Sequence, residues 1–219
     1  MEEDFDTIIR SYIDFVNAQV GVYMDALAGF AGHRTRVERQ VHRVNRPSGT
    51  KKDKDGNNVV VWASYEDPTQ PDIIHNRIIR AKDYIQANSP HGSNERQHSQ
   101  AILVFLFTYW EDEIRPRLAA SVNKETNDIR SDIMGDLRIA RNAILHSKGV
   151  IRAGKYKELK KLADMFAVDE TVHPSYDDMH KIFVFIKQDC ARLLFEYLGT
   201  EPPGFTHEDL VDVAIQKKR

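Results

Sequence analysis

The chain has few of the patterns that mark common catalytic sites. It contains one cysteine, Cys190, so neither an intrachain disulfide nor a four-cysteine zinc site can form. It has no HExxH sequence and no phosphate-binding loop of the GxxxxGK[ST] or GxGxxG type. A GxSxG nucleophile elbow is also missing. These absences disfavour zinc peptidases, P-loop and Rossmann enzymes and α/β hydrolases, and we expect no metal and no cofactor.

Long apolar runs are missing as well. The longest, AILVFLFTYW, has about ten residues, whereas a membrane span needs ~20. The N-terminal sequence MEEDFDTIIR is acidic and lacks the apolar segment of a signal peptide. We therefore expect a soluble, cytoplasmic protein with no membrane partner.

Composition is that of an ordinary folded domain. Apolar residues make up 41% of the 219 residues, enough for a buried core. The formal net charge is -2, so the whole-molecule charge does not indicate a nucleic-acid partner. Such a partner has to be inferred from local clusters of charge.

Helical periodicity dominates the chain. Apolar residues recur at three- and four-residue spacing, which predicts an all-α fold, an up-and-down bundle of four to five main helices. The predicted helices cover 5 to about 30 or beyond, a segment from an N-cap at Asp72 to Ile85, a buried central helix over 98–118, and 123–146, 155–166 and 173–199. Gly149 and Gly199 are placed as helix stops.

A polar segment interrupts this pattern. Residues 34–58 contain the turn sequences RPSGT and DKDGNN, and NVVVWASY after them is typical of a strand. We expect VHRV, residues 41–44, to be its partner. The predicted organisation is a helical domain over 1–199, a basic loop and β-hairpin insertion over 34–66, and a polar C-terminal tail over 200–219.

The insertion carries most of the local positive charge. Between Arg34 and Lys54 there are eight basic and two acidic residues, which leaves +6. Such a cluster can neutralise phosphates, so Arg36, Arg39 and Arg43 are candidate RNA-binding residues. Trp62 and Tyr65 are candidates for stacking on bases. A solvated, flexible hairpin explains the same residues equally well.

The stretch RNAILHSKG, Arg141 to Gly149, carries the main candidate site. An Arg five to seven positions before a His is expected roughly twice by chance in this composition, and two cases occur, Arg141 with His146 and Arg36 with His42. Context separates them, because Arg141, Asn142 and His146 lie in the last turns of an amphipathic helix with a glycine stop. The plain alternative is a surface arginine and a histidine that complements the helix dipole.

In this context RNAILH resembles the signature of the HEPN family of α-helical domains, an Arg followed by Asn, Asp or His and, after a short spacer, by His near a helix end. The long apolar helix before the motif helix and the long helix after it are similar in outline. The resemblance implies a metal-independent endoribonuclease of a toxin, CRISPR or antiviral system in which two domains pair. It also implies that Arg141 and His146 are catalytic and that Asn142 orients them. Lys148 stands where toxins paired with nucleotidyltransferase antitoxins often carry Tyr, which argues against that subgroup.

Helix geometry favours a site shared by two chains. A step of five residues turns ~140° around the axis, so Arg141 and His146 diverge on one helix, whereas Asn142 and His146 share a face. A homodimer cleft brings the two motifs together. There histidine can act as acid or base on RNA and arginine can hold the phosphate. Lys148 is a further candidate for phosphate binding, and Glu111 for orienting a motif residue.

Two other functions fit the same residues. One is a non-catalytic RNA-binding or partner-binding module on the same fold, favoured by the basic insertion. The other is a structural subunit of a larger assembly. For the ribonuclease we expect RNA as substrate, a second copy of the chain, and an antitoxin or defence-system protein as possible partners.

Overall fold

The computed structural model of the protein describes residues 4–42, 51–65, 69–70 and 74–199. The chain is a helical bundle with a small antiparallel sheet, which confirms the predicted fold class. It divides into two compact units, Met1–Met24 with His98–Arg219, and Asp25–Gln97. In the described part of the chain no helix combines the length and the apolar character that crossing a membrane requires. The predicted tail, 200–219, lies outside the described residues.

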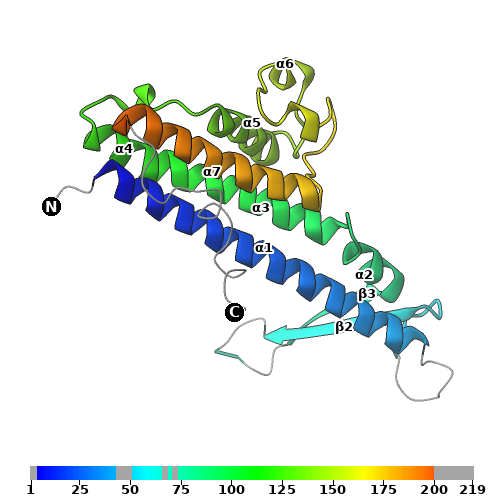
Figure 1. Ribbon diagram of the computed structural model, residues 1–219. Coiled ribbons are helices and arrows are strands. Elements are labelled where there is room, and N and C mark those ends of the chain that lie inside the picture. The colour runs from blue at the N-terminus through cyan, green and yellow to red at the C-terminus, as the bar shows by residue number, and fades with distance from the viewer. Residues whose placement is uncertain (1–3, 43–50, 66–68, 71–73, 200–219) are drawn as a thin grey trace, which may run out of the picture. The chain divides into compact units, whose positions relative to one another are not determined.

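The first unit is the helical bundle, and Figure 1 shows the beginning of α1, α3 and α7 lying side by side with α5 next to α7. Its main helices are the part of α1 (Phe5–His42) up to Met24, α3 (Ser93–Tyr109) from His98 onward, α4 (Arg115–Ser121), α5 (Asp132–His146), α6 (Ala153–Tyr156) and α7 (Tyr176–Leu198). Between them lie the π-helical turn η2 (Trp110–Ile114) and the 3-10 turns η3 (Thr126–Asp128) and η4 (Ala163–Met165).

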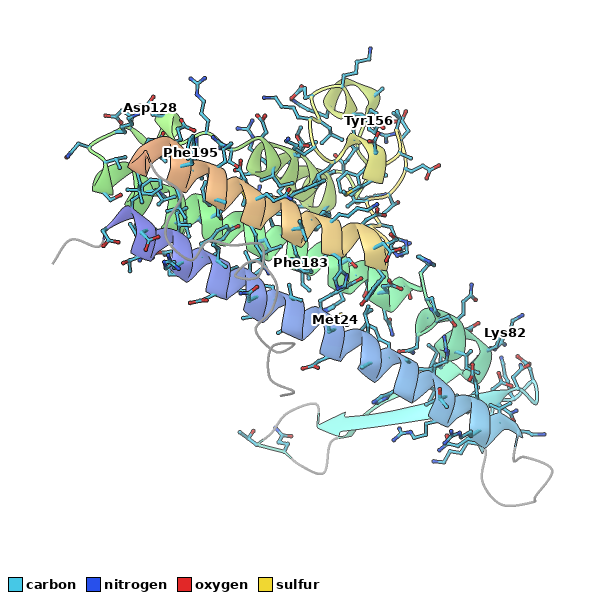
Figure 2. The ribbon with its side chains drawn as sticks, viewed as in Figure 1. Met24, Lys82, Asp128, Tyr156, Phe183 and Phe195 are labelled. Atoms are coloured by element: carbon cyan, nitrogen blue, oxygen red, sulfur yellow. The ribbon has the colours of Figure 1, made fainter. Side chains whose placement is uncertain are left out.

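Tyr12 lies at the centre of this bundle. Its side chain is fully buried, its hydroxyl donates to the carbonyl of Leu106 on α3 at 3.2 Å, and it contacts the sulfur of Met134 on α5. Its ring lies 5.3 Å from that of Trp110. Phe183, labelled in Figure 2, is a residue of α7, and its side chain is buried in the same core. These contacts join α1, α3 and α5 around one apolar core, which fixes the position of the motif helix α5.

Side chains and glycines define the ends of the two helices nearest the motif. Ser131 caps α5 by accepting from the amide of Met134 at 3.1 Å. Ser175 and Asp178 form a reciprocal capping box at the start of α7. Gly199 ends α7 in the left-handed conformation, with φ 72°, as its position in the sequence predicts.

The second unit contains the sheet and the chain on either side of it. It comprises the rest of α1, β1 (Lys51–Lys52), β2 (Asn58–Tyr65), β3 (Ile74–Arg80), α2 (Ala81–Ala87) and the start of α3. The strands are antiparallel in the order β1-β2-β3, and β2 pairs with β3 from Val59 opposite Arg80 to Tyr65 opposite Ile74. Arg80 forms ion pairs of 3.2 Å with Asp53 and with Asp55 in the turn between β1 and β2.

Two secondary-structure predictions for this unit are wrong. VHRV does not supply a strand, because α1 runs through Val41 and His42, and residues 43 and 44 lie outside the described residues. Residues 74–80 form β3 and not the first turns of a helix, and α2 begins only after Arg80. A short apolar run with isoleucines suits either structure, and pairing with the β-branched NVVVWASY decides for the strand. The sheet therefore extends to Arg80, past residue 66, where the predicted insertion ends.

Two predicted helices are shorter than expected. The helix predicted over 123–146 begins at Asp132, since the preceding segment forms η3 and an extended link to Ser131. The helix predicted over 155–166 is reduced to the single turn of α6 and, further on, η4. Both stretches are rich in charged and polar residues, which leaves too little apolar surface to hold a longer helix on the bundle.

Candidate functional site

Two of the three motif residues line one pocket at the end of α5. Asn142 and His146 lie one helical turn apart, and both are exposed. Arg138, one turn earlier, lines the same pocket. The three side chains therefore mark one face of α5, as a spacing of four residues predicts.

The pocket has a volume of about 560 Å³ and lies between α5 and the chain that follows it. Its lining combines an apolar floor with basic and polar side chains. The lining residues are Arg138, Ile139, Asn142, Ala143, His146, Ser147, Val150, Ile151, Arg152, Lys155 and Glu158. With histidine neutral, three basic residues against one acidic residue leave a charge of +2.

A tight reversal after α5 turns the chain back, so that the residues after it line the far side of this pocket. Lys148 and Gly149 both have positive φ, 53° and 83°, and the Gly149 amide donates to the carbonyl of Ala143 at 2.8 Å. A Cβ on Gly149 would lie 3.0 Å from Cγ2 of Thr171 and 3.1 Å from Nε2 of Gln100. Glycine is therefore required here for conformation and for space, which gives the predicted helix stop a second reason.

Asp136 anchors the same wall at its other end. This carboxylate is 1% exposed and accepts hydrogen bonds from the amides of Lys160, Lys161 and Leu162, at 2.6 to 3.0 Å. It sits on α5, two residues before Arg138. The segment around α6, in yellow in Figure 1, is thus fastened to the helix that carries the motif.

Arg141 lies apart from the other motif residues. It does not line the pocket, although its Nη1 donates to Oδ1 of Asn142 at 2.9 Å. Its Nε is buried and finds no hydrogen-bond partner in the described part of the chain. A buried unpartnered donor is uncommon and costs stability. Within one chain, then, Arg141 and His146 do not face the same space.

The other candidate residues near the motif lie outside this pocket. Lys148 is exposed in the left-handed turn and is not part of the lining. Glu111, in η2, accepts two hydrogen bonds from Arg115, at 3.0 and 3.1 Å. Among the described residues no hydrogen bond or ion pair joins Glu111 to a motif residue. Arg115 also donates to the carbonyl of Ile129 at 3.1 Å, so the Glu111–Arg115 pair ties η2 to the segment before α5.

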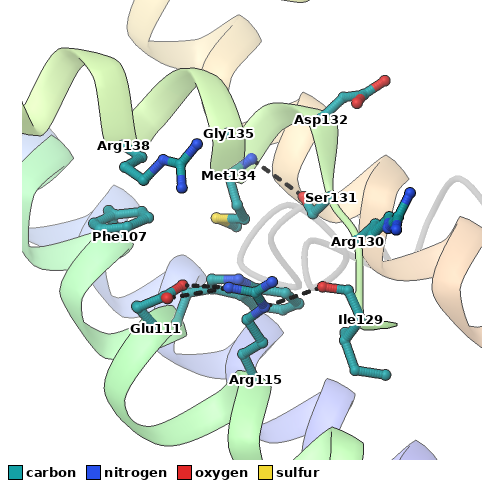
Figure 3. A pocket seen from close by; sticks show the side chains of 11 residues that line it. Phe107, Glu111, Arg115, Ile129, Arg130, Ser131, Asp132, Met134, Gly135 and Arg138 are labelled. Carbon is teal, nitrogen blue, oxygen red and sulfur yellow. Dashed lines mark hydrogen bonds and ion pairs between the residues drawn. The ribbon is translucent and has the colours of Figure 1, made fainter. Parts of the chain in front are cut away.

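Glu111 belongs to a second, smaller pocket of about 150 Å³, shown in Figure 3. Phe107, Met134 and Arg138 also line it. Arg138 is therefore common to both pockets. Figure 3 shows its guanidinium above Phe107, and no hydrogen bond or ion pair links it to another residue that the structure describes.

The basic residues of the predicted insertion lie in the second unit. Arg36 and Arg39 are exposed on the last turns of α1, and Lys51 and Lys52 are exposed on β1. Arg34 is 3.6 Å from Glu38. Arg43, the third RNA-binding candidate, lies outside the described residues, while β2 contains Trp62 and Tyr65.

Sequence reasoning missed the residues that turn the end of α5 into a pocket. Arg138 could have been predicted from the sequence, since residues 138, 142 and 146 repeat at four-residue spacing on one helix face. Arg152 and Lys155 could not, because the reversal at Gly149 brings them to the pocket that contains His146. Asp136 could not be predicted either, since an acid in a helix is usually exposed to solvent.

Comparisons with protein-family models, curated proteins and solved structures gave no match for this chain. In the residues that the structure describes, no group of three His, Cys, Asp or Glu side chains is placed to hold a metal ion.

Proposed function

We propose that the protein is an HEPN-type endoribonuclease that cleaves RNA without a metal, at a site composed by two copies of the chain. The observation that carries the proposal is the exposed pair of Asn142 and His146 in a basic pocket at the end of α5. Histidine is the side chain suited to proton transfer near neutral pH, and the surrounding cations suit a phosphodiester.

The proposed reaction is an internal transfer. The ribose 2′-oxygen bonds to the adjacent phosphorus and gives its proton to a base, while the bond to the 5′-oxygen breaks and that oxygen receives a proton. The products are a 2′,3′-cyclic phosphate and a 5′-hydroxyl. His146 of one chain is the proposed proton carrier, taking the proton from the 2′-oxygen and giving it to the leaving 5′-oxygen, and Arg141 of the other chain stabilises the charge on the phosphorane-like transition state. Asn142, hydrogen-bonded to Arg141, is a positioning residue.

The shared site follows from the placement of the arginine. Arg141 is outside the pocket that contains His146, and its buried Nε lacks a partner in the described part of the chain. A second copy offers the simplest way to bring an Arg141 to a His146. We extend the proposal to a role in prokaryotic defence or as a toxin, with an antitoxin or defence-system partner, on the family resemblance of RNAILH alone.

The test is RNA cleavage in EDTA by wild type, Arg141→Ala and His146→Ala. Arg10→Ala and His33→Ala are matched controls, since both residues are outside the proposed site and their hydrogen bonds, to Asp6 and to Tyr84, are exposed. Wild type and controls should cut RNA into fragments with cyclic-phosphate ends, and both motif variants should lose at least about a hundredfold in rate. Equal cleavage by the motif variants would remove the proposal.

The alternative, a non-catalytic RNA-binding module, is favoured by the exposed basic side chains of the second unit. Arg36 and Arg39 lie one turn apart on α1, and Lys51 and Lys52 are exposed on β1. Replacing Arg36, Arg39 and Arg43 by Gln should weaken RNA binding and flatten its salt dependence. Binding lost in this variant, with no cleavage by wild type, favours the module. No RNA binding at low salt contradicts it.

A further inference from the structure

The wall opposite α5 in the motif pocket brings two basic side chains to His146 that neither the motif nor the basic insertion includes. Arg152 and Lys155 are contributed by the start of α6, and both line the pocket with His146. Their positions are fixed by the chain reversal at Gly149 and by the hydrogen bonds of Asp136 to residues 160–162. The position of this segment is therefore set by the fold.

These cations are held only loosely by acids. Arg152 is 3.3 Å from Asp169, with side chains 72% and 54% exposed, and Lys155 is 2.8 Å from Glu158, with side chains 66% and 52% exposed. Ion pairs this exposed contribute little to stability, because water screens them. A phosphate can replace either carboxylate at small cost. Arg138, across the pocket, has no ion pair to any residue in the described part of the chain.

The floor of the pocket has a different character. Ala143 and Ile151 are buried, and Ile139 and Val150 are half-buried. A bare phosphate gains no binding energy from contact with such an apolar surface, whereas a base or a ribose can pack against it. The volume, about 560 Å³, falls within the roughly 300–1,000 Å³ that ligand pockets span. The pocket thus combines space for a nucleotide with a charged rim for its phosphate.

We propose that this pocket binds one nucleotide of single-stranded RNA beside the bond to be cut, with the phosphate on Arg152 and Lys155 and the base on the apolar floor. The proposal rests on the proposed ribonuclease function, because it assigns the substrate subsite of that same site. A nucleotide seated there brings the next phosphodiester to His146 at the pocket edge. A base can enter only when it is unstacked, so paired RNA is a poor substrate.

The binding experiment uses the full chain and nucleoside 3′-monophosphates, with inorganic phosphate and the bare nucleoside as separate probes. Binding is followed through the NMR signals of the His146 imidazole at fixed pH. The nucleotide should bind at least roughly tenfold more tightly than phosphate or nucleoside, since only it engages both floor and rim. Equal binding of phosphate and nucleotide would overturn the role of the floor.

Substitution tests the rim. Arg152→Ala with Lys155→Ala should weaken nucleotide binding by roughly tenfold or more, because two charge-assisted contacts are lost. Lys157→Ala is the matched control, an exposed lysine in the same segment that does not line the pocket. Unchanged binding in the double variant, with a normal circular-dichroism spectrum, would contradict the proposal.

Kinetics then separate this subsite from the proposed catalysis. In the double variant KM for single-stranded RNA should rise about tenfold while kcat changes less, because the substituted groups bind substrate and leave the motif intact. If wild type cleaves RNA and the double variant keeps its KM, the subsite is wrong and the ribonuclease stands. If wild type cleaves nothing but binds the nucleotide through Arg152 and Lys155, the ribonuclease is wrong and the pocket stands.

Discussion

Nη1 of Arg141 donates a hydrogen bond to Oδ1 of Asn142, its immediate neighbour, at 2.9 Å. Consecutive residues on a helix point about 100° apart, so this bond bends the arginine side chain towards the face that carries Asn142 and His146 without placing it in their pocket. Asn142 thus accepts a hydrogen bond from Arg141 and lines the pocket that contains His146. For the proposed ribonuclease, this makes a second chain necessary and gives Asn142 a positioning role.

The shared site can be tested by mixing two inactive proteins. Arg141→Ala and His146→Ala dimers, allowed to exchange subunits, should recover about a quarter of wild-type activity. Random exchange makes half of the dimers mixed. A mixed dimer has two sites, and in one of them the intact Arg141 of one chain meets the intact His146 of the other, so half of its sites are active. Native mass spectrometry would verify the exchange. A mixture that exchanges fully and stays inactive would place both residues of each reaction in the same chain.

The glycine that ends α5 should be intolerant of substitution. Gly149→Ala forces a Cβ against Thr171 and Gln100 in a backbone conformation that favours glycine, so we expect a loss of about 1–3 kcal/mol in the free energy of unfolding. Urea denaturation measures it. Gly154→Ala is the control nearby, because nothing lies within 4 Å of its Cβ position and it is helical, so it should be neutral or slightly stabilising. Equal effects at both positions would contradict the assigned role of Gly149.

Much of the helical bundle follows from local sequence signals. The periodic apolar faces of α1, α3, α5 and α7 predict these helices, and Gly149 and Gly199 predict two of their ends. Local signals fail at residues 74–80, where a distant strand decides the structure. β2 offers seven pairing partners from Val59 to Tyr65, and no property of IHNRIIR alone distinguishes a paired strand from a helical turn.

The candidate site likewise has one part that the sequence predicts and one part that depends on contacts between distant residues. Asn142 and His146 share a face because helix geometry requires it, so the sequence predicts their common exposure. The opposite wall depends on Asp136, whose three amide partners lie 24 to 26 residues further along the chain. Hydrogen bonds between a buried carboxylate and amides so far along the chain cannot be predicted from residue spacing or composition. Arg152 and Lys155 therefore become candidates only once the fold is known.

Asp136 should be the most sensitive acid in this part of the chain. Asp136→Ala leaves three backbone amides without their acceptor, so we expect about 3 kcal/mol of destabilisation and faster proteolysis between residues 149 and 162. Asp132→Ala is a matched control on the same helix, since it removes an exposed pair with Lys160 and one exposed acid from the first turn of α5, and should cost only about 1 kcal/mol. Urea unfolding and limited trypsin digestion provide the two readouts. Similar stability losses in the two variants would show that the wall is not held by Asp136.

The single cysteine should report on the core of the bundle through its pH dependence. Burial raises the pKa of Cys190 well above that of an exposed thiol, and the nearby Asp189 adds to the effect. The native protein then keeps its proton at pH values where the unfolded chain has lost it. The contribution of Cys190 to stability is full below the unfolded pKa, about 8.5, and falls by up to about 1.4 kcal/mol per pH unit above it. Urea unfolding from pH 7 to 10.5 should show a steeper alkaline decline for wild type than for Cys190→Ala, in which only this titration is removed. A second measurement follows the reaction of the Cys190 thiol with a thiol reagent. This reaction should be far slower in native protein than in protein unfolded by urea. Parallel pH profiles, or rapid labelling of the native protein, would show that the α7 face carrying Cys190 is open to solvent.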